Sequence, residues 1–310
     1  MKSRVVSLLS LPVLAIALVA GCSSSDSTTE SESGDAAPAA ATDASGAVSD
    51  NKVIDDSIVF LQIETSGYVQ YPTTDGGLEW SDEWTVTSGC TGWFAGSEGE
   101  IVTAGHCVDP EEARKRIIQE FLDYEGAIDL ANDAISNWKV EGFDAGAPLD
   151  VVLTIKQPSI EGQVINDWMP VQLVDLIKSQ DGDLALLRAN GVNGDTPALR
   201  VASEQAESGD PVTAIGFPSS VSAVSNEMVI PNPSFKTGTV SSRQISERGV
   251  AGLEVNADIS GGMSGGPTVN ANGEVIGVNS FTISGEEQAF NFITDTRDLN
   301  RFLQQNGVGN

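Results

Sequence analysis

The sequence Gly262-Met263-Ser264-Gly265-Gly266-Pro267 places one serine among glycines. On a tight turn such a serine can present its hydroxyl to a carbonyl group, while neighbouring backbone N–H groups stay free to hold the oxyanion that forms. The same residues also suit a plain loop. Two distant stretches favour the first interpretation: Thr103-Ala104-Gly105-His106-Cys107 contains the single histidine of the chain, and Asp181-Gly182-Asp183-Leu184-Ala185-Leu186-Leu187 places acids before an apolar run.

Composition bounds the class of protein. The chain has 310 residues, 40% of them hydrophobic, with 32 Gly and 13 Pro, which is typical of a turn-rich globular protein. Sixteen Lys and Arg against 44 Asp and Glu give a formal net charge of −28, which opposes binding to a phosphate backbone. We therefore expect no nucleic acid partner, and we interpret the acidity as solubility outside the cell.

The N-terminus has the pattern of an export signal. A basic start, Met1-Lys2-Ser3-Arg4, precedes an apolar run, Val5 to Val19, that is short for a membrane span. Leu18-Val19-Ala20-Gly21-Cys22 follows and resembles the bacterial lipobox, which implies a signal peptide over residues 1–21 and lipidation of Cys22. We expect a protein anchored by lipid to the cell membrane and facing the extracytoplasmic side. The alternative is an ordinary cleaved signal and a secreted protein.

Residues 22–52 follow the signal with Ser, Ala, Thr and acidic residues and no aromatic residue, so we expect a disordered tether. Without Cys22, the chain keeps two cysteines, Cys90 and Cys107. An even pair in an exported protein predicts a disulfide, worth about 3 kcal/mol in the chain-entropy account. This bridge would tie the chain directly beside His106.

Residues 53–310 are expected to form one all-β domain. The segments expected as strands are short runs between Gly and Pro turns: 58–65, 83–88, 90–95, 100–104, 151–155, 171–177, 184–188, 211–218, 236–241, 252–257 and 273–279. This pattern favours antiparallel sheets closed into barrels over a parallel sheet. Residues 110–122 and 128–138 have helical spacing and predict a two-helix insertion over about 110–140, in which Ile117, Phe121, Ile128, Ile135 and Trp138 pack onto the body. Residues 295–305 predict a C-terminal helix.

Ser264, His106 and Asp183 are the three residue types that acyl transfer requires. A serine hydroxyl is a poor nucleophile at neutral pH, so it needs a base to accept its proton and an acidic group to orient that base. Their order in the chain, His then Asp then Ser, is the order of the chymotrypsin arrangement and not that of α/β-hydrolases or subtilisins. Asp181 is a rival for the acidic role.

With these motifs the sequence resembles the chymotrypsin-like serine peptidases with the trypsin fold, and among them the bacterial HtrA-like catalytic domains. Residues 209–218 and 273–279 add secondary matches, and the similarity covers about residues 53–305. The resemblance implies two antiparallel six-stranded β-barrels and a Cys90–Cys107 bridge. It also implies Ser264 as nucleophile, His106 as general base and then acid, and Asp183 as orienting carboxylate. The backbone N–H groups of Gly262 and Ser264 would form the oxyanion hole.

Three departures from the family concern regulation and access. Met263 stands where chymotrypsin and its relatives carry an aspartate that pairs with a new N-terminus, so that mode of zymogen activation is not expected. The helical insertion lies on a loop that borders the cleft in the family, where it would shape access or serve as scaffold. No PDZ-like segment is expected after the peptidase domain.

Specificity is the least determined property. Asp258 stands six residues before Ser264, at the ungapped position of the acid that selects Lys and Arg in trypsin. The segment containing Ser280 and Phe281 resembles the strand that pairs with the substrate backbone, and Phe281 could narrow the pocket. We expect an endopeptidase that cleaves protein or peptide substrates through an acyl-enzyme and needs no cofactor or metal. The alternative is a catalytically silent surface binding or regulatory lipoprotein on the same scaffold.

Overall fold

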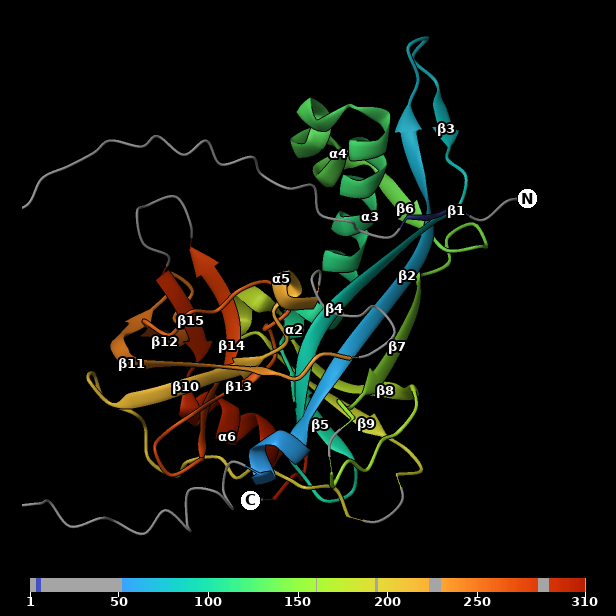
Figure 1. Ribbon diagram of the computed structural model, residues 1–310. Helices are drawn as coiled ribbons and strands as arrows, with labels where there is room; N and C mark the ends of the chain where they lie inside the picture. The colour runs from blue at the N-terminus through green and yellow to red at the C-terminus, as the bar shows by residue number, and fades with distance from the viewer. Residues whose placement is uncertain are drawn as a thin grey trace, which may run out of the picture.

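The computed structural model describes residues 4–6, 52–159, 161–192, 195–222, 230–283 and 290–309. Most of the predicted signal peptide, the lipidation site Cys22 and nearly all of the tether lie outside these residues. The two bodies in Figure 1 are β-barrels that lie side by side. Across the described ranges, no helix combines the length and apolar character that crossing a membrane requires.

The first barrel is closed in the order β4-β5-β9-β8-β7-β2, because β2 pairs with β4 as well as with β7. Every pairing within this ring is antiparallel. The strands are β2 (Ile58–Pro72), β4 (Trp84–Phe94), β5 (Glu100–Thr103), β7 (Asp150–Lys156), β8 (Met169–Ile177) and β9 (Leu184–Ala189). Three short strands extend the sheet: β1 (Arg4–Val6) lies parallel to β4, and β3 (Leu78–Trp80) and β6 (Lys139–Glu141) pair with the far end of β2.

The second barrel is closed in the order β10-β11-β12-β15-β14-β13, again with antiparallel neighbours. Its strands are β10 (Pro211–Gly216), β11 (Ser234–Ile245), β12 (Ala251–Val255), β13 (Pro267–Val269), β14 (Val275–Ile283) and β15 (Phe290–Thr294). The two closed rings confirm the fold expected from the sequence.

The boundaries differ from the expectation at strand β4, which runs unbroken from Trp84 to Phe94, where two strands, 83–88 and 90–95, were expected. Gly89 does not interrupt the ladder, because it pairs with Gln62 and its missing side chain makes room for a ring. A Cβ at Gly89 would lie 2.7 Å from Cζ of Phe60. The prediction of a break was therefore wrong: this glycine serves close packing within a strand.

The helical insertion follows the histidine turn as predicted. Asp109 caps α3 (Pro110–Glu125) by accepting a hydrogen bond from the Glu111 amide, and Pro110 occupies the first helical position. Gly126 ends the helix in the left-handed conformation, with φ of 68°. The short helices η1 (Ile128–Leu130) and α4 (Ala131–Asn137) follow.

The insertion packs against the outer part of β2 and β4, above the first barrel (Figure 1). Phe121 lies edge-on to Trp84 and Trp138, with ring centroids 5.8 and 6.0 Å apart. Ile117, Phe121 and Trp138 are buried as expected. Ile128 is 59% exposed, so the prediction that it packs onto the body was wrong. It begins a separate 3-10 turn that has no buried residue, and so it does not continue the apolar stripe of α3.

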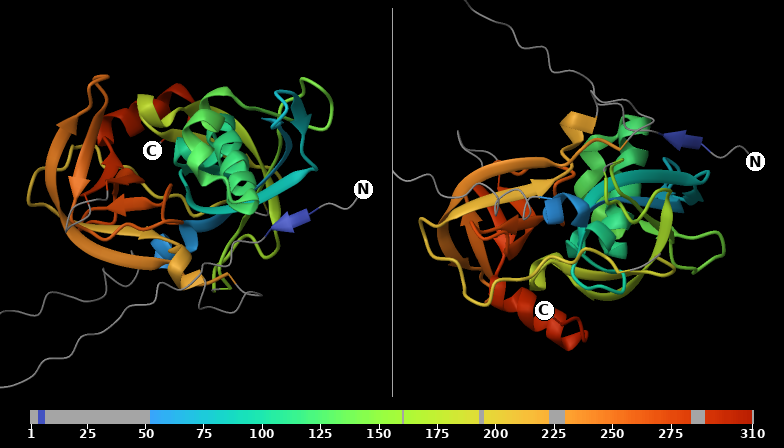
Figure 2. Two further views of the ribbon diagram at one scale, coloured as in Figure 1. Left: turned by 90° about the horizontal axis from the view of Figure 1, so that it is seen from above. Right: turned by 60° about the horizontal axis from the view of Figure 1, so that its bottom comes forward.

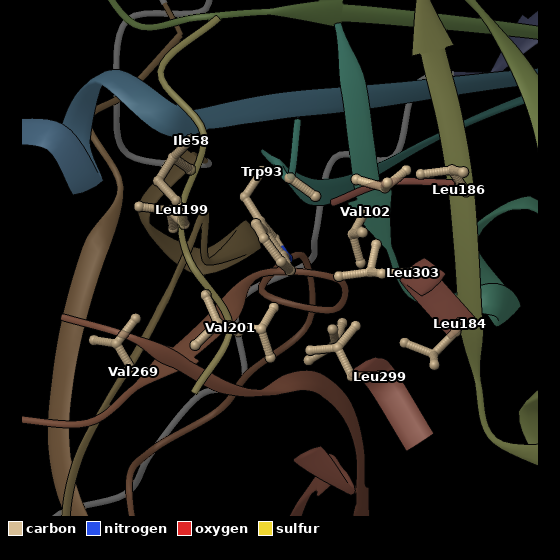
Figure 3. Packing of buried hydrophobic residues seen from close by; sticks show 14 of the residues in the cluster. Ile58, Trp93, Val102, Leu184, Leu186, Leu199, Val201, Val269, Leu299 and Leu303 are labelled. Atoms are coloured by element: carbon tan, nitrogen blue, oxygen red, sulfur yellow. The ribbon is translucent and has the colours of Figure 1, made fainter. Parts of the chain in front are cut away.

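A hydrophobic core joins the two barrels and the C-terminal helix α6 (Thr296–Gln305). Figure 3 shows Trp93 and Val102 of the first barrel close to Leu299 and Leu303 of α6. Figure 2 shows from two further directions that α6 lies on the surface beside both barrels. Asp295 caps this helix by accepting from the Arg297 amide at 3.0 Å. This core fixes the two barrels relative to each other, and therefore fixes any site whose residues come from both.

Candidate active site

His106 and Asp183 meet at one end of the first barrel. His106 belongs to the short helix α2 (Gly105–Val108), directly after β5, and Asp183 directly precedes β9, the strand paired with β5. Nδ1 of His106 lies 2.9 Å from Oδ2 of Asp183, and the backbone N–H of His106 donates to Oδ1 at 2.8 Å. The carboxylate therefore holds both the ring and the main chain of the histidine. A carboxylate acceptor at Nδ1 favours the tautomer with Nδ1 protonated and Nε2 free to accept a proton.

Asp183 is buried, with 2% of its surface exposed. Burial alone would raise its pKa, but the hydrogen bonds and charge of His106, with a further hydrogen bond from Ser280, hold the pKa below its ordinary value. The buried group thus stays an anion that stabilises a positive charge on the imidazole.

The backbone around Asp183 has a conformation that few side chains adopt. Asp183 has φ of 56°, the one positive φ among the described non-glycine residues, and it follows Gly182 with φ of 143°. This turn leads out of η2 (Ser179–Asp181). Gly105 allows α2 to lie close to the end of β8, since a Cβ at this position would lie 2.2 Å from the carbonyl oxygen of Ile177. Positive φ at a non-glycine residue is found where surrounding structure enforces it, often at functional sites.

Ser264 lies on a turn of the second barrel between β12 and β13. Gly262 and Gly265 have φ of 88° and 87°, and the amide of Gly266 donates to the Met263 carbonyl at 3.0 Å. A Cβ at Gly266 would lie 2.0 Å from a neighbouring carbonyl oxygen, so the glycines are needed for the turn to enter the barrel. Met263 is fully buried, in the core of the second barrel.

Thr91 of β4 holds this turn against the first barrel. Its backbone N–H donates to the carbonyl of Ser264 at 2.8 Å, and its hydroxyl donates to the carbonyl of Gly262 at 2.8 Å. The same hydroxyl accepts from the amide of Phe217 at 3.0 Å. The Cys90–Cys107 disulfide lies alongside, with Sγ of Cys107 3.9 Å from the carbonyl oxygen of Ser264. The turn that carries Ser264 is therefore attached to the barrel that carries His106.

Ser280 links the two halves of the site. Its hydroxyl donates to Oδ2 of Asp183, and its carbonyl accepts from the hydroxyl of Ser264 at 3.5 Å. In the described part of the chain no hydrogen bond joins the Ser264 hydroxyl to His106. Such bonds in serine hydrolases are often long without substrate and tighten in the reacting complex. Ser280, expected as a substrate contact, thus also contacts the acidic member of the site through its side chain.

The amides of Gly262 and Ser264 donate no hydrogen bond to any described residue. The peptide that carries the Gly262 N–H is fixed from its other side: the carbonyl of Gly261 accepts from the amide of Ser219 at 2.8 Å and from its hydroxyl at 2.9 Å. In a trans peptide the N–H points opposite to the C=O. The Gly262 N–H is therefore directed away from Ser219, and both amides are available to an oxyanion.

Cys90, His106 and Cys107 are the described residues whose side chains cluster like metal ligands, with ligand atoms within 4.8 Å of one another. The two sulfur atoms are bonded to each other. Because thiolates and not disulfide sulfurs bind metals, this cluster does not form a metal site as it stands.

The remaining predicted residues lie as follows. Asp181 is exposed and forms an ion pair with Arg248 at 2.9 Å, so its carboxylate is directed to a surface arginine. Asp258 is exposed. Phe281 belongs to β14, where its backbone pairs with Phe292, but its side chain lies outside the description. Thr91 and Ser219 carry no sequence signal for their contacts and were not anticipated.

Two comparisons place the chain among known proteins. Residues 90–278 match the trypsin-like peptidase domain family, so the chain belongs to that family. This stretch includes His106, Asp183 and Ser264. The serine protease PepD of Mycobacterium tuberculosis is 35% identical over 108 residues, which are 32% of this chain and 21% of the relative. The chain thus matches about a fifth of the length of that relative.

Proposed function

We propose that this protein is a serine endopeptidase that cleaves peptide bonds through a triad of Ser264, His106 and Asp183. The observation that carries the proposal is that Asp183 is hydrogen-bonded to His106 twice, at the ring Nδ1 and at the backbone N–H. A histidine with only a packing role would not need a buried carboxylate bonded to both its imidazole and its backbone N–H. The family membership and the likeness to a serine protease support the same activity.

In this mechanism His106 Nε2 takes the proton of the Ser264 hydroxyl as the oxygen attacks the scissile carbonyl. The imidazolium that forms is stabilised by Asp183, whose pKa is held low so that it stays ionised. The amides of Gly262 and Ser264 donate to the tetrahedral oxyanion, an interaction worth about 3 kcal/mol per donor. His106 then returns the proton to the leaving amine. In the second half, His106 accepts a proton from water as the water oxygen attacks the acyl-enzyme, and returns it to the Ser264 oxygen as the acid product leaves.

An apolar cavity of about 610 Å³ supports binding of an extended substrate. Its walls are the segment Ser179–Gln180, which leads into Asp183, the β11–β12 hairpin and Phe292 of β15. Because Phe292 pairs with Phe281, a substrate strand added along β14 would reach this cavity with a side chain upstream of the cleaved bond. The apolar lining favours a hydrophobic residue there.

We also propose that the mature protein begins at a lipidated Cys22 and acts on the extracytoplasmic side of the cell membrane. The support is the lipobox-like sequence Leu18-Val19-Ala20-Gly21-Cys22 after a basic and apolar start. Mass spectrometry of the N-terminal peptide from membrane-extracted protein tests this directly. An N-terminus other than Cys22, or Cys22 without acyl groups, would mean that the protein is secreted.

Fluorophosphonate labelling of the full chain tests the activity. A single adduct mapped by mass spectrometry to Ser264, absent in Ser264→Ala, is the expected result, since only an activated serine reacts rapidly. A well-folded protein without an adduct would refute the proposal and favour a catalytically silent binding lipoprotein. Circular dichroism of the Ser264→Ala variant controls for the fold.

A further inference from the structure

Arg116 of the helical insertion reaches back to the catalytic histidine. Its Nη2 atom donates to the carbonyl of His106 at 2.7 Å and lies 3.4 Å from the carbonyl of Cys107. Its Nη1 atom donates to the hydroxyl of Ser88 in β4 at 2.6 Å. One planar guanidinium thus joins the histidine turn, the insertion and the first barrel.

We infer that Arg116 is a positioning residue for His106, and that the insertion fixes the catalytic base through it. The inference rests on the proposed peptidase function. The carbonyls of His106 and Cys107 are the terminal acceptors of the four-residue helix α2, which the helix itself leaves unpaired. A cation with several donors is suited to such a helix C-terminus.

The partial burial of the Arg116 guanidinium costs desolvation free energy, which indicates that its hydrogen bonds have a structural or functional role. The guanidinium is half-buried and forms no ion pair within the described ranges; burial lowers its pKa, partly offset by the charge of Glu112 one turn earlier on α3. A charged group taken from water into such a site is retained where its hydrogen bonds replace those to water. Lysine would not replace it, since an ammonium lacks the planar fork that spans Ser88 and His106.

Two opposite charges therefore hold the main chain of His106 from both sides. Asp183 accepts from its N–H at 2.8 Å, and Arg116 donates to its carbonyl at 2.7 Å. The ring is fixed separately, by Asp183 at Nδ1. Without Arg116 the C-terminal side of α2 is free to shift, and the imidazole moves with the backbone that carries it.

The same helix offers a matched control in Arg114. It donates to the carbonyls of Ile135 and Trp138, at 2.7 and 3.2 Å, and so ties α3 to the end of α4. Arg114→Met removes an arginine that holds carbonyl oxygens but leaves the histidine turn untouched. If the insertion acts only as scaffold, Arg114→Met and Arg116→Met should have similar effects.

The test compares wild type, Arg116→Met, Arg116→Lys and Arg114→Met in full-length protein. Fluorophosphonate inactivation separates kinact, which depends on His106, from KI, which depends on binding. We expect kinact to fall about 10- to 100-fold in Arg116→Met with KI unchanged, since small displacements of a catalytic group have effects of this size. Arg116→Lys should show a smaller loss, and Arg114→Met should keep the wild-type kinact.

A spectroscopic readout makes the test independent of activity. The chain has a single histidine, so ¹⁵N-histidine labelling gives one imidazole to follow by NMR. We expect the Nδ1–H resonance of His106 to shift or broaden in both Arg116 variants and to stay in place in Arg114→Met. If wild type does not react with fluorophosphonate, the proposed function fails and this resonance alone decides the role of Arg116.

Three results would overturn the inference. One is a folded Arg116→Met protein with wild-type kinact and an unmoved resonance. Another is an equal loss in Arg114→Met, which would assign the effect to the stability of the insertion. The third applies if Arg116→Met does not fold. It is a folded Arg116→Lys protein that keeps both the wild-type kinact and the wild-type position of the His106 resonance.

Discussion

Thr91→Val replaces the hydroxyl of the residue that holds the turn carrying Ser264 by a methyl group. The side chain of Thr91 is fully buried, and valine has nearly the same shape. Two polar groups lose their partner: the carbonyl of Gly262, which accepts from the hydroxyl at 2.8 Å, and the amide of Phe217, which donates to it at 3.0 Å. The backbone bond from Thr91 to Ser264 remains.

The magnitude follows from these two groups. Each buried group left unpaired costs about 1–3 kcal/mol, so the pair costs about 2–6 kcal/mol. The added methyl group of valine returns about 0.8 kcal/mol through burial. We therefore expect Thr91→Val to lower the free energy of unfolding by about 3 kcal/mol, and to lower the thermal midpoint by roughly 6–12 °C in a domain of this size.

Urea denaturation followed by tryptophan fluorescence measures this change. Thr85→Val is the matched control, because Thr85 lies on the same strand and its hydroxyl has one partner, the hydroxyl of Ser66 at 2.8 Å. We expect a change of no more than about 1 kcal/mol for the control. If Thr91→Val is within about 0.5 kcal/mol of wild type, the usual range of surface changes, the assigned role of Thr91 is wrong.

The further predictions concern three other residues. Asp183→Asn should lower kcat by about 10³- to 10⁴-fold, because the amide cannot hold the imidazole in the same tautomer. Folding lowers the pKa of Asp183, so its contribution to stability is complete above its unfolded-state pKa and is lost as the pH falls through the lower folded-state pKa. Urea midpoints measured from pH 6 to 3 should therefore fall less steeply in Asp183→Asn than in wild type. Gly266→Ala should abolish fluorophosphonate labelling and folded yield, because its Cβ would lie 2.0 Å from a carbonyl oxygen; Gly309→Ala, with nothing within 4 Å, should behave as wild type. Asp295→Ala should cost about 3 kcal/mol in urea denaturation, since it removes a helix cap and leaves Arg243 without its carboxylate, 2.9 Å away in the intact protein.

The sequence predicted those strands and helices that are marked by adjacent residues, such as apolar runs and helix caps. Strand β9 begins with the apolar run Leu184–Leu187, and helix α3 is flanked by its capping residues Asp109 and Gly126. Gly89 was misinterpreted because a glycine that ends a strand and a glycine that makes room for a ring look the same in sequence. Strand β13 was missed because it has three residues and begins with proline.

Contacts between distant segments could not be predicted in the same way. The hydroxyl of Thr91 meets the carbonyl of Gly262 across 171 residues, and Ser280 meets Asp183 across 97. Each depends on how the barrels pack, not on any motif around the residue. The candidate triad was found because its three motifs stand in the order of a known family, whereas the residues that hold them carry no comparable pattern.

Strand β4 connects these supports. Within four consecutive residues, Ser88 accepts from Arg116 of the insertion, Cys90 is bonded to Cys107 beside His106, and Thr91 holds the turn of Ser264. The proposed triad takes its residues from both barrels, and the histidine turn, the serine turn and the insertion are each attached to this one segment. The proposed base, His106, and the proposed nucleophile, Ser264, are thus positioned by separate contacts from a common strand. A change at Arg116 should therefore disturb the histidine without loosening the serine turn, and a change at Thr91 should do the reverse.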